Sequence, residues 1–168
     1  MLEIFDAIAY VRGGNLAPEV SGTVKFWGVD EGSWVEVEIF GLPEFQEATE
    51  RTPQIGPFGF HIHENDTCGS IHRDPPFEAA GGHWNPDGEQ HGNHAGDFPV
   101  LFSNGGTAKM LFFTDRFFPE EIIGRSVVIH QSPDDYVTQP SGSGGKRIAC
   151  GSIERGMNAE TNNQTAKA

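Results

Sequence analysis

The sequence predicts an all-β domain, a sandwich or flattened barrel built from short antiparallel strands. Apolar and polar residues alternate in several short runs, which is the period of a half-buried strand. The 22 glycines and 11 prolines among 168 residues indicate many turns. Helical periodicity is limited to a single turn at 119–123. These features indicate about seven or eight strands that are joined by glycine-rich turns.

The first strands follow from the alternation. The run 4–11 is the first candidate strand, and residues 20–42 read as a β-hairpin. In the second half of that hairpin, Glu36 and Glu38 alternate with apolar side chains, so one face is polar and the other buried. Gly32 lies between the two runs and supplies a turn residue that tolerates positive φ.

Four further runs have strand character, and they are 59–63, 107–113, 126–130 and 147–153. Three segments between them are too long and too polar for simple turns: 64–82, 85–97 and 131–146. Long ordered loops on a β scaffold usually carry function. We therefore expect the functional side chains to lie in or beside these loops.

The length fits one domain, which we place at 1–153. Residues 154–168 lack apolar periodicity and are expected to form a mobile tail.

Charge and hydropathy exclude two classes of partner. With 11 Lys and Arg against 24 Asp and Glu, the net charge of −13 argues against a nucleic-acid partner. No run approaches the roughly 20 apolar residues of a membrane-spanning helix. Glu3 and Asp6 stand where a signal peptide carries positive charge, so we expect a cytoplasmic protein, with an exported mature form still open.

Two cysteines, Cys68 and Cys150, are too few for a disulfide framework. One bridge and two free thiols are both compatible with the sequence.

The histidines form patterns that are typical of metal ligands. His61 and His63 are two apart on a predicted strand, so their side chains point to the same face and can converge on one ion. Two histidines on a solvated strand face are the simpler alternative. His130, at the end of another predicted strand, and His83, ahead of the second long loop, add further imidazoles.

A second group lies within one loop. His91, His94 and Asp97 follow one another at intervals of three residues, and His83 can complete a tetrahedral set of three imidazoles and one carboxylate. Such a set is typical of a structural zinc site. The two groups together hold more ligands than a single zinc ion uses.

Five segments resemble, in order, the signature segments of copper/zinc superoxide dismutase, in a bacterial form with a short zinc loop. The resemblance extends over residues 9–153. The segments are Gly59-Phe-His-Ile-His-Glu64, Gly82-His-Trp-Asn-Pro86, His94-Ala-Gly-Asp97, Gly124-Arg-Ser-Val-Val-Ile-His130 and Arg147-Ile-Ala-Cys-Gly151.

The resemblance implies one copper and one zinc ion per chain. The copper ligands it implies are His61, His63, His83 and His130. The zinc ligands it implies are His83, which bridges the two metals, and His91, His94 and Asp97. It also implies an eight-stranded Greek-key sandwich, in agreement with the strand pattern.

The same resemblance assigns roles outside the ligands. Cys68 and Cys150 correspond to the family disulfide, and Asp134 to the carboxylate that hydrogen-bonds one ligand at each metal. Arg147 corresponds to the arginine at the mouth of the copper channel, and Lys146 beside it adds positive charge. The implied reaction is dismutation of superoxide to O₂ and H₂O₂ by one-electron cycling of copper. In it, Arg147 guides the anion and His83 carries a proton.

Some features depart from the family pattern, and three other functions compete. His91 and His94 are close together, Trp84 replaces a common Phe, and His72 has no family counterpart. The rivals are a copper carrier without turnover, a zinc hydrolase that uses Glu64 as its base, and a structural protein with incidental histidines. A complete set of ligands and Arg147 favours the enzyme. A homodimer is among the expected assemblies.

Overall fold

The computed structural model describes residues 4–70 and 75–156, which contain seven strands and two short helical turns. In chain order the elements are β1 (Ala7–Gly13), β2 (Ser21–Val29), β3 (Gly32–Phe40), β4 (Phe60–His63), η1 (Glu78–Ala80), β5 (Ala108–Thr114), α1 (Pro119–Ile122), β6 (Ser126–His130) and β7 (Arg147–Arg155). The predicted all-β class is confirmed. The turn α1 lies where a helical turn was expected, whereas the 3-10 turn η1 was not predicted.

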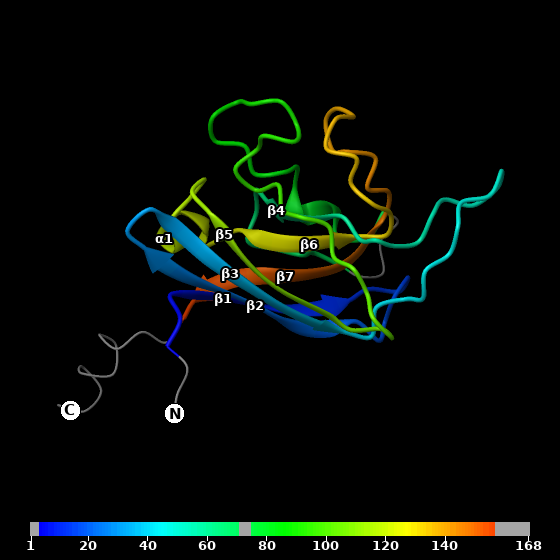
Figure 1. Cartoon of the computed structure of the whole chain (residues 1–168), viewed down its shortest axis with the longest axis horizontal. Helices are drawn as coiled ribbons and strands as arrows, with labels where there is room; N and C mark the ends of the chain where they lie inside the picture. The colour runs from blue at the N-terminus through cyan, green and yellow to red at the C-terminus, as the bar shows by residue number, and fades with distance from the viewer. Residues whose placement is uncertain (1–3, 71–74, 157–168) are drawn as a thin grey trace.

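All seven strands join one antiparallel sheet in the order β4-β6-β7-β1-β2-β3-β5. The sheet curls, so β4 and β6 lie over β1, β2 and β3 as a second layer (Figure 1). The loops 85–97 and 131–146 rise from the same side of the molecule, above β4 and β6 (Figure 1). The curl therefore brings two of the three predicted functional loops together.

The described residues form seven strands where the resemblance implied eight. Segment 97–101 lies beside β4, but it pairs only through isolated bridges, Asp97 with His61 and Leu101 with Phe58. Pro99, between the two bridges, has no amide hydrogen to contribute to a ladder. The segment that could form the remaining strand is therefore held at two points only.

The hairpin of β2 and β3 is confirmed, with Val29 opposite Gly32. Gly32 is the first residue of β3 and not part of the turn itself. It has a φ of +148°, and a Cβ there would lie 2.2 Å from the Thr114 carbonyl oxygen at the end of β5, so this position requires glycine. The first strand begins later than expected, at Ala7, and the last strand ends later, at Arg155, and these two residues pair with each other. The first two residues of the predicted tail thus belong to β7, and 157–168 lie outside the described residues.

Strand β4 is buried on both faces. Phe60 and Ile62 are fully buried in the main apolar core, while His61 and His63 are buried on the opposite face. An exposed strand face would leave the two imidazoles in water. Here the long loops cover them, so the pair of histidines on β4 lies inside the protein.

The loop 64–82 is tied to β7 by a disulfide between Cys68 and Cys150. Of the two states that the sequence allowed, the bridged one is present. Among the described residues, no helix is long and apolar enough to cross a membrane.

Candidate metal centre

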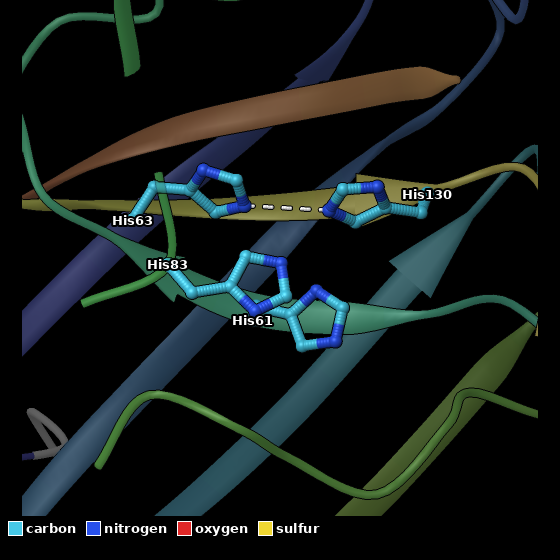
Figure 2. A group of neighbouring side chains, drawn as sticks. All are labelled: His61, His63, His83 and His130. Carbon is cyan, nitrogen blue, oxygen red and sulfur yellow. Dashed lines mark hydrogen bonds between the residues drawn. The ribbon is translucent and has the colours of Figure 1, made fainter. Parts of the chain in front are cut away.

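Four histidines from three parts of the chain converge beneath the loops. His61 and His63 come from β4, His130 ends β6, and His83 follows the loop that the disulfide anchors. One ring nitrogen from each lies within 4.8 Å of the others. Figure 2 shows His63 and His130 facing each other, with the rings of His61 and His83 stacked beside them at 3.9 Å between centroids.

Backbone carbonyls decide which nitrogen of two of these rings faces inward. His63 Nδ1 donates to the Gly81 carbonyl at 2.9 Å, and His130 Nδ1 approaches the Gly145 carbonyl at 3.4 Å. The two Nε2 atoms are left facing each other at 3.3 Å. Because the outer nitrogens carry the hydrogens, the inner ones present lone pairs to a common centre.

The other two rings of this group leave polar atoms without partners. His61 Nδ1 and His83 Nε2 are buried and have no hydrogen-bond partner among the described residues. A buried imidazole nitrogen without a partner costs free energy, and such groups are rare unless a ligand satisfies them. The four inner nitrogens therefore form an all-imidazole cage.

A second group surrounds the carboxylate of Asp97. His83 Nδ1 lies 3.2 Å from Oδ1, His91 Nδ1 3.2 Å from Oδ2, and His94 Nδ1 3.4 Å from Oδ1. In the part of the chain that the structure describes, His91 Nδ1 and His94 Nδ1 are buried without a hydrogen bond, although a carboxylate is near. Their geometry suits a shared ion better than it suits hydrogen bonds. His83 belongs to both groups, one nitrogen to each.

Asp134 connects the two groups through the ring nitrogens that face away from the two centres. His61 Nε2 donates to its Oδ2 at 2.5 Å, and His91 Nε2 donates to its Oδ1 at 2.8 Å. Each ring is thereby held in the tautomer that leaves Nδ1 free of hydrogen. The carboxylate is itself held, because the Tyr136 amide donates to Oδ1 at 2.7 Å.

Burial keeps His61, His63 and His130 neutral. Burial, together with the neighbouring imidazoles, lowers the pKa of His61 and of His63 well below the usual 6.5. Burial likewise lowers the pKa of His130 to about 3. For Asp97, burial acts to raise the pKa, but hydrogen bonds from His83 and from the Gly92 amide lower it to about 2. At neutral pH His61, His63 and His130 are therefore neutral and the Asp97 carboxylate is ionised, as metal binding requires.

Arg147 lies at the start of β7, opposite His130. Its two terminal nitrogens each donate at 2.6 Å, Nη1 to the Phe77 carbonyl and Nη2 to the Gly81 carbonyl. The Gly81 carbonyl also accepts from His63, so one oxygen joins the arginine to the cage. Lys146, which precedes it in the chain, is exposed.

The family model described as copper/zinc superoxide dismutase (SODC) matches residues 20–153. This chain belongs to the copper/zinc superoxide dismutase family. A superoxide dismutase [Cu-Zn] from Deinococcus radiodurans is 36% identical over 150 residues, covering 79% of this chain and 76% of the relative. Another, from Photobacterium leiognathi, is 37% identical over 170 residues, covering 90% and 96%.

Among solved structures, a Cu/Zn superoxide dismutase from Brucella abortus superposes with a TM-score of 0.70 at 29% identity. The match covers 89% of this chain and 100% of the Brucella abortus chain. Membership of the copper/zinc superoxide dismutase family makes this chain an oxidoreductase whose cofactors are copper and zinc.

The two groups of donors fit these cofactors. Four imidazoles suit copper, and three imidazoles with one carboxylate suit zinc. The four buried nitrogens without partners belong to these two groups, two of them to each.

The structure brings together every ligand candidate from the sequence, along with Asp134 and Arg147. His72 lies outside the described residues. Sequence reasoning missed the contacts that support the site, which come from Gln139, Tyr136 and the carbonyl of Gly81. Glutamine and tyrosine in a polar loop give no spacing signal, and a carbonyl is common to every residue, so these roles emerge only from the folded geometry.

Proposed function

We propose that this chain dismutates superoxide at two metals, copper in the His61, His63, His83 and His130 cage and zinc at His83, His91, His94 and Asp97. The observation that carries the proposal is the set of buried imidazole nitrogens that converge on two centres without hydrogen-bond partners. Copper bound in the cage supplies a one-electron couple that takes an electron from one superoxide and returns it to another.

The stoichiometry of the reaction shows what the protein itself must provide. Two superoxide anions and two protons give O₂ and H₂O₂, so the site must admit an anion and provide protons. His83 is the residue placed to hold a proton, because its Nδ1 lies on the Asp97 side while Nε2 points into the cage with no partner. A hydrogen carried on Nε2 stands within the cage, where the product forms.

Arg147 is the residue placed to receive the anion. Two of its hydrogens go to the Phe77 and Gly81 carbonyls, which leaves donors of the five that a guanidinium carries. The net charge of −13 repels superoxide from the protein as a whole. Attraction must therefore be local, and Arg147 with exposed Lys146 supplies positive charge beside the cage.

The anchored loop sets the position of the arginine. Phe77 and Gly81 lie on the segment that the bridge between Cys68 and Cys150 ties to β7. Their carbonyls fix the guanidinium relative to His63, which shares the Gly81 oxygen. The disulfide thus supports the anion site as well as the fold.

The substitution His130→Ala tests the proposal. His130 belongs to the copper group alone, so protein loaded with both metals should keep zinc, lose copper and lose superoxide consumption. His72→Ala, at the one histidine that belongs to neither set of proposed ligands, is the control and should retain both metals and activity. Full turnover by the His130 variant would contradict the proposal. The homodimer and the cytoplasmic location stay predictions.

A further inference from the structure

His91 is held by its backbone as well as by its ring. The side-chain Oε1 of Gln139 accepts from the His91 amide at 2.8 Å, and its Nε2 donates to the His91 carbonyl at 3.2 Å. A side chain 48 residues away thus pairs with both main-chain groups of this histidine, as a neighbouring strand does in a sheet.

The orientation of the Gln139 amide is determined by its three contacts. The His91 N–H can only donate, so the oxygen of the side chain must face it. The nitrogen then donates to the His91 carbonyl and, at 3.2 Å, to the Val137 carbonyl. The reverse orientation would place two donors together at the first contact and two acceptors at the others.

The loop 131–146 therefore contacts His91 on several sides. Asp134 fixes the ring, Gln139 fixes the backbone, and Tyr136 packs against the following residue. A Cβ on Gly92 would lie 2.2 Å from the Tyr136 carbonyl oxygen, so the two loops are in close contact there. His94 is held differently, through a bond from Arg116 to its carbonyl at 2.9 Å.

The direction of His91 Nδ1 follows from these restraints. That nitrogen is buried, makes no hydrogen bond to any described residue and lies 3.2 Å from Asp97 Oδ2. Asp134 alone would let the ring swing about the hydrogen bond at Nε2, because one bond leaves the Cα of His91 unrestrained. Two further bonds to the backbone remove that freedom.

We propose that Gln139 is a positioning residue for zinc, which holds His91 against the loop 131–146 and so slows the release of the ion. The inference rests on the proposed zinc site at His83, His91, His94 and Asp97. Among the described residues, the hydrogen bonds of Gln139 to His91 go to its main chain and not to its ring, so Gln139 acts through that main chain.

The test compares Gln139→Met with Gln90→Met in protein loaded with copper and zinc. The methionine keeps the length of the side chain and removes both hydrogen bonds to His91. Gln90 precedes His91, is exposed, and makes no side-chain hydrogen bond to the described residues, so its replacement is a matched control. The rate of zinc transfer to a colorimetric chelator is measured for both variants and for the unaltered chain.

Supporting interactions behind metal ligands change affinity by about 10- to 100-fold. Because Gln139 is exposed to solvent, we expect an effect at the lower end of this range, with a zinc-release rate about tenfold higher than in the control. The visible absorption of Co²⁺ placed in the zinc site should shift, because the direction of one ligand changes. The melting temperature of the metal-free protein should match that of the Gln90 variant.

Two results would overturn the proposal. One is a zinc-release rate equal to the control. The other is faster release with an unchanged Co²⁺ spectrum and a lower melting temperature without metal, which marks a general loss of stability. None of these readouts uses superoxide, so a failure of the proposed function would be seen separately, in the turnover of the unaltered chain.

Discussion

Asp134→Asn is the substitution that probes the connection between the two metal groups. The carboxylate accepts three hydrogen bonds, from His61 Nε2, His91 Nε2 and the Tyr136 amide. An amide has one oxygen and one NH₂ group, so it can accept from one imidazole but faces the other with a donor. That second ring must move its hydrogen to Nδ1, the nitrogen that the metal needs.

The magnitude follows from the bond that is lost. A hydrogen bond to a charged group contributes about 1.5–3 kcal/mol. At 1.36 kcal/mol for each factor of ten, the affinity for one metal should fall by about 10- to 150-fold. The affected metal is copper if His61 changes tautomer, and zinc if His91 does. The assay is the ratio of each metal to protein after dialysis against graded concentrations of chelator.

Asp135→Asn is the matched control. The Asp135 carboxylate is exposed and, within the described part of the chain, accepts hydrogen bonds only from Val137 and Thr138 of its own loop. The control should retain both metals. Retention of both metals by the Asp134 variant at every chelator concentration would refute the idea that this carboxylate sets the tautomers of the two rings.

Three further predictions concern the anion site, pH and the disulfide. Arg147→Ala should keep both metals, lower superoxide turnover and weaken its dependence on ionic strength; unchanged turnover and salt dependence would remove the arginine from the mechanism. Burial lowers the pKa of His130 from 6.5 to about 3, so between those pH values the unfolded chain binds a proton that the folded chain does not. The metal-free protein should therefore lose stability as pH falls through that window in urea titrations, and a constant midpoint would contradict this reasoning. Replacing Cys68 and Cys150 with Ser removes a disulfide between residues that are 82 positions apart. In the chain-entropy model this should lower the free energy of unfolding by about 4.5 kcal/mol, and a decrease of less than about 1 kcal/mol would count against that model.

The fold could be predicted well where the pattern was local. The hairpin of β2 and β3 depends on alternation and on Gly32, both of which can be read from neighbouring residues. The eighth strand could not be assessed in that way. Whether segment 97–101 pairs continuously depends on how it meets β4, and Pro99 allows only isolated bridges there.

The candidate site shows the same division. His61 and His63 share a face because a strand alternates, so their convergence follows from spacing alone. The burial of that face does not, since it depends on loops that fold over β4 from elsewhere in the chain. The hydrogen bonding between Gln139 and the His91 main chain is harder still to predict, because it joins two irregular loops through one residue of each.

The proposed function requires that the two converging groups of imidazoles hold copper and zinc for superoxide dismutation. The most direct test loads the metal-free protein with both ions, measures metal content, and follows superoxide decay after pulse radiolysis. We predict one copper and one zinc per chain, with turnover that depends on copper. Protein that binds both metals in this ratio but leaves the decay of superoxide at its spontaneous rate would contradict the claim.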